Sequence, residues 1–212
     1  MHVAEIWRYP VKSLAGERLE SADVSAMGIA QDREIVIVRA ANSRITTARR
    51  YPKLLALHGG LDPAGIPTIN GISWDTSEAR TLIEEAVGEP VQLVRITGPE
   101  RFDVLPLLVA TDGAVASIGV DRRRFRPNIL IGYVNGLEER TWPGKQLRIG
   151  EIVIAAADLR ERCVMTTYDP DTQVQDISVL QRIVRDYDGT FALDCSVVTP
   201  GTIRVGDPVE LL

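Results

Sequence analysis

The residue in this chain with the clearest potential for chemistry is Cys163. It follows Arg160 and Arg162 and precedes Thr166-Thr167 and the turn Asp169-Pro170-Asp171. Neighbouring guanidinium groups favour the ionised form of a thiol, and the thiolate is both a nucleophile and a ligand for soft metals. Cys163 is therefore the candidate catalytic residue and the candidate metal ligand.

The second cysteine has a different setting. Cys195 lies in an alternating segment in which Phe191, Leu193 and Val197 share its face of a predicted strand. This pattern is typical of a buried cysteine that behaves as a small hydrophobic residue. Two cysteines placed so differently do not indicate a disulfide framework.

Three further clusters carry positive charge. They are Lys12-Ser13 after the first predicted strand, Asp32-Arg33 at the start of the third, and the run Arg122–Asn128. Guanidinium groups are planar donor forks that match phosphate, and lysine adds a point charge. Thr111-Asp112 begins a predicted helix, whose backbone N–H groups could bind an anion. Together these clusters predict a site for a phosphorylated, polar heterocycle beside the Cys163 thiolate.

Each cluster has a simpler interpretation when it is taken alone. An arginine run such as 122–126 is more often a solvated or salt-bridged surface. Lys12-Ser13 is compatible with an ordinary turn, and a free cysteine is usually a packed hydrophobic residue. The joint pattern, and no single cluster, supports a binding site.

Length and composition restrict the class of protein. The 212 residues fit one large domain or two small ones, and 45% hydrophobic with 25% charged residues is ordinary for a soluble protein with a full core. The net charge of −5 gives no general attraction to nucleic acid or anionic membranes, so we expect neither as a partner. No signal peptide and no membrane-spanning run is apparent, and we expect a cytoplasmic location.

Short strands dominate the elements that must position these residues. Asn70-Gly71 predicts a tight hairpin, and Asp75 or Thr76 can cap a helix that Gly88 ends. Another helix, capped by Asp176, is expected to turn four residues inward: Ile177, Leu180, Ile183 and Val184.

Many short strands with few helices favour an α+β, mainly β protein built around β-barrels. The segment 97–103 is the best candidate boundary. We expect a smaller, strand-rich N-terminal region over residues 1–97, a β-barrel domain over residues 98–212, and the site in the cleft between them.

The segment Arg162–Thr167 followed by Asp169-Pro170-Asp171 resembles the signature of the MOSC-domain family, relatives of the molybdenum cofactor sulfurase C-terminal domain and of the mitochondrial amidoxime-reducing component. Further segments resemble the family in the same order along nearly the whole chain: residues 9–14, 28–33, 46–52, 124–129, 142–150 and 201–207.

The resemblance implies a molybdenum cofactor of the molybdopterin type, with Cys163 as the cysteine that binds molybdenum. It also implies that eight residues hold the cofactor: Lys12, Ser13, Arg33, Thr111, Asp112, Arg126, Asn128 and Arg162. The implied activity is an oxidoreductase that reduces N-hydroxylated compounds such as amidoximes or hydroxylamines. Its electrons would come from a separate protein of the ferredoxin or flavin reductase type.

Two positions depart from the family pattern. Glu161 stands where the family often has a small residue or cysteine, and a carboxylate pointing inward there would oppose a pterin phosphate. Gln173 stands where the family usually has glycine, which removes a flexible turn. The chain also lacks any four-cysteine spacing, so we expect no iron–sulfur cluster and no ferredoxin module.

Other functions stay open. One alternative is a carrier or binding module, in which Cys163 holds a persulfide or the cleft holds the cofactor without turnover. Another is a degenerate relative with an empty cleft. Descriptions of the family also mention pyridoxal phosphate, which needs a Schiff-base lysine. Lys12 is better suited to phosphate, and the other lysines are Lys53 and Lys145. His2 and His58 are the only histidines, and no zinc spacing exists.

Overall fold

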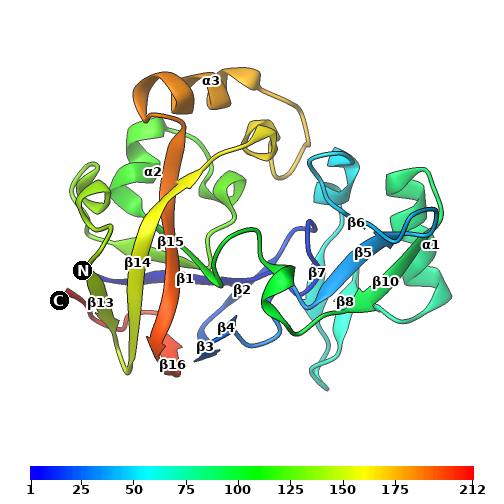
Figure 1. Ribbon diagram of the computed structural model, residues 1–212, viewed down its shortest axis with the longest axis horizontal. Helices are drawn as coiled ribbons and strands as arrows, with labels where there is room; N and C mark the ends of the chain where they lie inside the picture. The colour runs from blue at the N-terminus through cyan, green and yellow to red at the C-terminus, as the bar shows by residue number, and fades with distance from the viewer.

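The computed structural model describes residues 1–212 as a mainly β protein with three α-helices, which confirms the expected fold class (Figure 1). Its largest sheet has eight strands, and all neighbouring pairs are antiparallel except β11 with β12. In spatial order the strands are β17 (Val209–Leu211), β13 (Gln146–Ile149), β14 (Ile152–Glu161), β15 (Thr190–Thr199), β11 (Leu107–Thr111), β12 (Ile129–Gly132), β1 (His2–Arg8) and β2 (Glu17–Leu19).

The large sheet does not close into a barrel, which corrects the expectation of a β-barrel domain. β17 and β2 are its two edges. The two sides meet through a few backbone contacts. These are an isolated bridge between His2 and Pro208 and hydrogen bonds that include Val3 N–H to the Asp207 carbonyl at 2.9 Å and Gly206 N–H to the Val3 carbonyl at 2.8 Å. These contacts do not form a regular ladder, and the backbone turns at residues 205–206 just before β17 begins.

Three smaller sheets complete the fold. They contain β10 (Val91–Arg95), β5 (Ile35–Arg39) and β6 (Ile45–Thr46); β16 (Gly201–Arg204), β3 (Ser21–Ser25) and β4 (Gly28–Ile29); and β7 (Gly59–Leu61), β8 (Pro67–Ile69) and β9 (Ile72–Ser73). A separate apolar core, which includes Ile35, Ile37 and Ile83, joins β5 to helix α1 (Ser77–Val87). Figure 1 shows this second body at the end of the molecule away from the two termini.

Local signals in the sequence fix several turns and caps. Asn70 and Gly71 both have left-handed backbone angles, φ 52° and 82°, as the hairpin between β8 and β9 requires. The Thr76 side chain accepts from the Ala79 N–H and begins α1, so Thr76 is the cap. Gly88 ends the helix at φ 78°.

Two helices and a ring stack cover one face of the large sheet. They are α2 (Asp112–Ile118) and α3 (Ile177–Asp186), and Phe125 stacks on Phe191 beneath them with ring centroids 4.1 Å apart. Five short 3-10 segments serve as connections: η1 (Pro52–Ala56), η2 (Pro99–Arg101), η3 (Arg122–Phe125), η4 (Glu138–Thr141) and η5 (Val164–Thr167).

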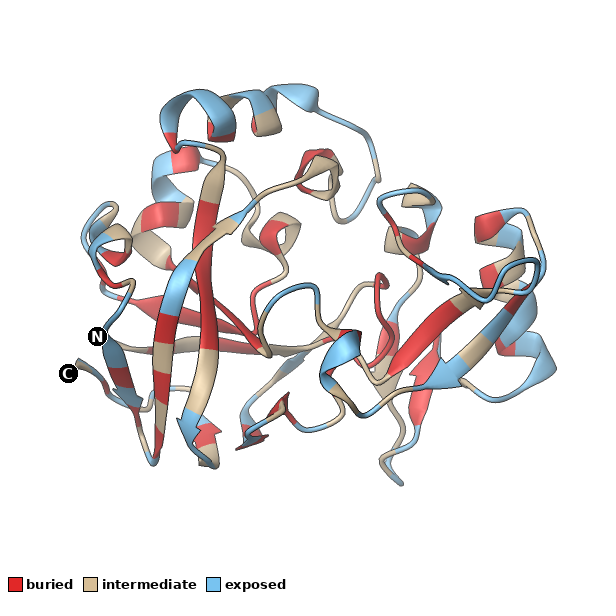
Figure 2. Cartoon of the chain, viewed as in Figure 1, coloured by how far each residue is buried: buried red, intermediate tan, exposed pale blue.

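The inward face of α3 differs from the expected one. Ile177 and Val184 are exposed, whereas Val179 and Ile183 are buried. Both sets fit helical spacing, and the choice follows from Tyr187, which continues the stripe of Val179 and Ile183 and packs edge-on against Phe191. Figure 2 shows the outer surface of α3 as largely exposed.

A bulge at Ala192 changes the expected face of Phe191. Ala192 has φ 68°, and the pairing of β14 with β15 shifts register at this point. Phe191 therefore packs under α2 and α3, while Leu193 and Cys195 enter the core of the large sheet. The burial predicted for Cys195 is confirmed. None of the three α-helices is both long and apolar enough to cross a bilayer.

A matched pair of substitutions tests the face of α3. Ile183→Ala removes a side chain that is 0% exposed and should lower the free energy of unfolding by about 2–4 kcal/mol, whereas Ile177→Ala, at a position that is 58% exposed, should cost less than about 0.5 kcal/mol. Urea unfolding followed by circular dichroism measures both. Equal losses would contradict this placement of the helix.

Candidate functional site

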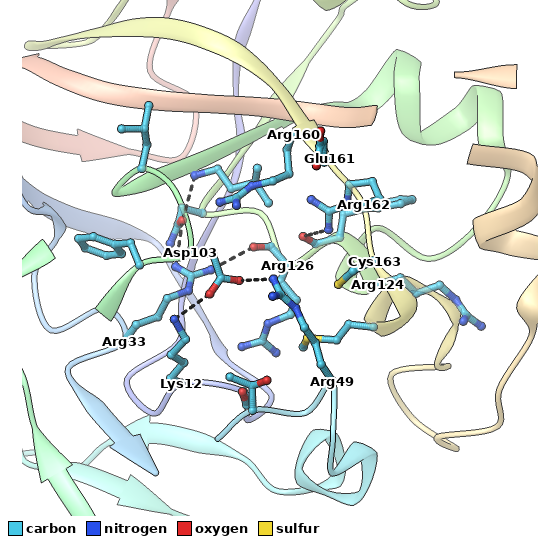
Figure 3. Close-up of a pocket in the computed structure, with 18 residues that line it drawn as sticks. Lys12, Arg33, Arg49, Asp103, Arg124, Arg126, Arg160, Glu161, Arg162 and Cys163 are labelled. Carbon is cyan, nitrogen blue, oxygen red and sulfur yellow. Dashed lines mark hydrogen bonds and ion pairs between the residues drawn. The ribbon is translucent and has the colours of Figure 1, made fainter. Parts of the chain in front are cut away.

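One cavity brings together most of the predicted site residues (Figure 3). It lies where the loop after β1, the loop before β5, η3 and the end of β14 meet, and its empty volume is about 770 Å³. Seven of the nine predicted residues line it: Lys12, Ser13, Arg33, Arg126, Asn128, Arg162 and Cys163. These residues are far apart in the sequence, so the tertiary fold assembles the site.

Positive charge dominates the lining of this cavity. The chain carries a net charge of −5, yet only two carboxylates line the cavity, Asp103 and Glu161. The cationic side chains in the lining are Lys12, Arg33, Arg49, Arg124, Arg126, Arg160 and Arg162. Such a concentration of donor forks suits a ligand with several anionic oxygens.

The aromatic ring of Tyr9 supports two of the guanidinium groups. Cζ of Arg33 lies 4.9 Å and Cζ of Arg126 lies 4.2 Å from the centre of the ring. Burial raises the pKa of Tyr9 to about 12, so its hydroxyl stays neutral and donates to the Pro127 carbonyl at 3.1 Å. Below the ring, buried Asp32 accepts from the Tyr9 N–H at 2.8 Å and forms an ion pair with Arg33.

Asn128 holds the same cluster from the other half of the chain. Its buried side-chain oxygen accepts from the Leu108 N–H at 3.1 Å and from Arg33 Nη1 at 3.2 Å. Its amide nitrogen donates to the Trp7 carbonyl at 3.3 Å. Asn128 therefore joins β11 and β1 and orients the guanidinium of Arg33.

Three of the residues in the cavity have unusual backbone angles. Ser13, Arg33 and Arg126 lie in the left-handed region, with φ of 78°, 57° and 57°. This conformation is uncommon for residues other than glycine and costs on the order of 1–3 kcal/mol each in sparsely populated regions. The Ser13 hydroxyl accepts from the Ala48 N–H at 3.1 Å, which holds one of these turns. A cluster of such residues around one cavity is typical of a functional site.

Asp103 is an internal counter-ion in the cavity. Its two oxygens pair with Lys12 Nζ at 2.8 Å and with Arg49 Nη2 at 2.9 Å. Burial alone would raise the pKa of Asp103, but these two cations hold it below its usual range. Burial also lowers the pKa of Lys12, against the opposing effect of Asp103. The carboxylate thus stays ionised beside two cations that a stronger anion could recruit.

Arg126 and Arg162 are half-buried cations in the lining of the cavity. Burial lowers the pKa of each to about 10, so both remain charged at neutral pH. Arg162 Nη2 donates to the Phe125 carbonyl at 2.9 Å. Arg126 Nη2 and Arg162 Nε are buried without any hydrogen-bond partner. Buried donors of this kind are costly, and a ligand with anionic oxygens would satisfy those it can reach.

Cys163 is half-buried at the end of β14, where η5 begins. The Arg49 guanidinium lies close to this sulfur. Burial alone would lower the pKa of Arg49, but its neighbours Asp103 and Cys163 raise it. Figure 3 shows Cys163 on the same side of the cavity as Arg124 and Arg162. No group of three or more His, Cys, Asp or Glu side chains in this protein could hold a metal ion. A metal at Cys163 would need to bring most of its ligands with it.

Thr111 and Asp112 do not line the cavity, although the resemblance implied cofactor contacts for both. The buried Thr111 hydroxyl caps α2 by accepting from the Ala114 N–H at 3.2 Å and also donates to Glu139 at 3.1 Å. Asp112 accepts from three backbone N–H groups, including that of Tyr133 at 2.8 Å. Both side chains are occupied in holding α2 against the loop after β12.

Several cavity residues have no strong local signal in the sequence. Arg160 alternates along β14 like any strand residue, and its direction is set by an ion pair at 2.8 Å with buried Asp194 on β15. Asp103 reaches the cavity from a loop, whereas Arg124 reaches it from η3, within the arginine run that the sequence singles out. Arg49 lies in a segment that resembles the family, which was the one available indication.

The two departures from the family pattern have different outcomes. Glu161 does line the cavity, so a carboxylate is present at its rim. Gln173 adopts φ 57°, the conformation that glycine favours, and its side chain donates to the Pro170 carbonyl at 3.1 Å. The turn after Asp169-Pro170-Asp171 therefore forms without glycine.

Sequence profiles of two domains match the chain almost from end to end. The MOSC N-terminal beta barrel domain matches residues 1–102, and the MOSC domain matches residues 109–210. The chain belongs to the MOSC-domain family.

Relatives of this MOSC protein include mitochondrial amidoxime reducing component 2 of Homo sapiens, which is 27% identical over 98% of this chain and 82% of its own length. Mitochondrial amidoxime-reducing component 1 of Homo sapiens is 25% identical over 99% of this chain and 82% of its own length. Among solved structures, the YuaD protein from Bacillus subtilis has a similar fold, with a TM-score of 0.54, 12% identity, and coverage of 99% of this chain and 93% of that one.

The buried arginines give the cavity a specific pH dependence. Binding of inorganic phosphate should weaken as the pH rises through about 10, because Arg126 and Arg162 lose their charge near pKa 10, whereas an ordinary arginine stays charged above pH 12. Lys12, whose pKa burial also lowers, adds to the same decline. Isothermal titration calorimetry between pH 8 and about 11 measures the affinity.

Arg126→Met is the informative variant. It should bind phosphate more weakly than the wild type at pH 8, and its phosphate affinity should fall less steeply as the pH rises. Arg148→Met, at an exposed position outside the cavity, should behave like the wild type. A phosphate affinity that stays constant through pH 10 would refute this electrostatic description.

Proposed function

We propose that this protein binds a molybdenum cofactor of the molybdopterin type and uses it to reduce N-hydroxylated compounds such as amidoximes or hydroxylamines. The observation that carries the proposal is a half-buried thiol, Cys163, in a cavity whose lining contains seven cationic side chains. Membership of the MOSC-domain family supports the cofactor. Amidoxime-reducing relatives support the substrate class.

The chemistry of the lining fits this cofactor. A molybdopterin carries an anionic phosphate and brings dithiolene sulfur ligands for its metal. The absence of any protein cluster able to hold a bare ion agrees with a metal that arrives in its own organic scaffold. Soft thiolate ligands suit such a centre. The buried, unpartnered nitrogens of Arg126 and Arg162 would satisfy their hydrogen bonds with ligand oxygens.

The protein's own residues would bind and orient the cofactor. Lys12, Arg33 and Arg126 would neutralise its phosphate, with Asp103 released from Lys12 as the stronger anion enters. Cys163 would supply a thiolate ligand to the metal. When bound, the cofactor would supply the two-electron redox centre that removes oxygen from the N–O group. The electrons would come from a separate protein, because this sequence has two cysteines and an iron–sulfur cluster is usually held by four.

A cofactor carrier is the second candidate. Glu161 in the lining favours it, because a carboxylate at the rim opposes tight, permanent retention of an anionic ligand. A pyridoxal phosphate enzyme has less support. Lys12 is the only lysine in the cavity, and it is held by Asp103 and by the Arg101 carbonyl at 2.7 Å. A Schiff base needs a free amine, whereas both of these contacts occupy Nζ of Lys12.

The metal content of cysteine variants tests the proposed ligand. Protein produced in a host that makes the cofactor should contain molybdenum and pterin in the wild type and in Cys195→Ala, whose sulfur is buried in the core. Cys163→Ala should lose the molybdenum. Elemental analysis by mass spectrometry, with the fluorescence of oxidised pterin, gives both quantities. Equal molybdenum in the two variants would remove Cys163 as the ligand.

Turnover separates the enzyme from the carrier. The loaded wild type, supplied with an artificial electron donor, should reduce benzamidoxime or hydroxylamine. Lys12→Met should lower the activity in proportion to the cofactor it loses, because we assign Lys12 to cofactor binding. Stoichiometric cofactor without turnover would favour the carrier and refute the enzyme.

A further inference from the structure

A second cavity lies beside the first and is separated from it by a shared wall. Its empty volume is about 860 Å³. Arg124, Arg126 and Met165 line both cavities, whereas Lys12 and Cys163 line only the first. A molecule in the second cavity would therefore contact the rear of the cationic cluster and would not reach the thiol.

Aromatic side chains form much of the wall of this second cavity. Trp7, Tyr9 and Tyr168 line it, with Leu55 among the apolar residues. Gly16 also belongs to the lining, and a Cβ atom there would lie 2.4 Å from the Tyr9 ring. Only glycine allows the chain to pass so close to that ring. The cavity thus offers planar surfaces on which another ring can stack.

The charges in the lining all have one sign. Four arginines line the second cavity, and no carboxylate does, in a chain with more acidic than basic residues. Arg123 is already paired with Asp121 and Asp171, each at 2.7 Å. Arg124 is paired with an aspartate as well, Asp169, at 3.0 Å.

Arg18 remains available to a ligand in this cavity, and Arg126, which also lines the first cavity, adds positive charge. Arg18 is exposed at the edge of the cavity and forms no ion pair or side-chain hydrogen bond. Arg126 stacks on Tyr9, and its buried Nη2 has no partner. The Tyr168 hydroxyl also has no hydrogen-bond partner within the protein. The lining of this cavity thus combines aromatic rings with donor groups that have no partner within the protein.

We propose that the second cavity binds a planar aromatic anion of the aryl carboxylate class, with its ring against Trp7 and Tyr168 and its carboxylate on Arg18. An aliphatic anion would leave the rings without a stacking partner, and a neutral aromatic compound would leave the cations unpaired. The site does not depend on the molybdenum cofactor, because its distinctive residues lie outside the first cavity.

The experiment compares two probes of the same shape, 2-naphthoate and the neutral 2-naphthalenemethanol. Isothermal titration calorimetry on the full chain should show naphthoate binding about tenfold or more tightly, the amount expected for one charge-assisted contact. Arg18→Gln should lower the naphthoate affinity about three- to tenfold and leave the alcohol unchanged. Trp7→Leu should weaken both probes, since it removes a stacking surface.

Two control variants locate the bound probe. Arg49→Gln changes only the first cavity, and Arg148→Gln changes an exposed residue outside both; each should bind naphthoate like the wild type. Thermal unfolding confirms that every variant is folded. Equal affinity for the two probes would overturn the proposal. So would a loss of naphthoate binding in Arg49→Gln with none in Arg18→Gln, since the probe would then occupy the first cavity.

Discussion

The structure depends on keeping a group of guanidinium and ammonium ions charged in a site that is partly shielded from water. Like charges repel, and burial disfavours the ionised form, so each cation needs its own compensation. Asp32 supports Arg33, Asp194 supports Arg160, and Asp103 is shared by two cations. The neutral ring of Tyr9 supports two of the guanidinium groups, those of Arg33 and Arg126, which stack on it. Compensation is incomplete, and the nitrogens left without partners show where a ligand would bind.

The connectivity of the fold brings these cations together. β1 lies in the large sheet beside β12, although it begins the N-terminal region, so the loops after β1 and before β12 open at the same place. Lys12 and Ser13 leave one strand there, and Arg126 precedes the other. Asn128 ties the two by side-chain hydrogen bonds. Two of the left-handed residues, Ser13 and Arg126, lie in these loops, and the third, Arg33, lies in the loop before β5. Their backbone strain lowers stability at the place where their side chains line the cavity.

Predictions from sequence succeeded where the cause is local. Asn70-Gly71 and the Thr76 and Gly88 caps of α1 depend on a few neighbouring residues, and the structure has each of them. The face of α3 and the bulge at Ala192 depend on a ring stack between distant segments, which periodicity does not reveal. The prediction of a closed barrel was wrong for a similar reason, because closure needs pairing between the two edge strands of the sheet, which are far apart in the sequence. Short distinctive segments supplied seven predicted site residues that line one cavity. Thr111, which caps α2, and Asp112, which accepts from the loop after β12, lie outside its lining, and the cofactor contacts of all nine stay a prediction. Arg160 was missed because only its tertiary partner directs it.

The sulfur shell around the metal is the most direct test of the account. X-ray absorption at the molybdenum K edge, recorded on the loaded wild-type protein, counts the sulfur neighbours of the metal. If the cationic cavity holds an anionic cofactor against Cys163, the shell should contain the thiolate sulfur in addition to the dithiolene pair. A shell that consists of the dithiolene sulfurs alone would contradict the account.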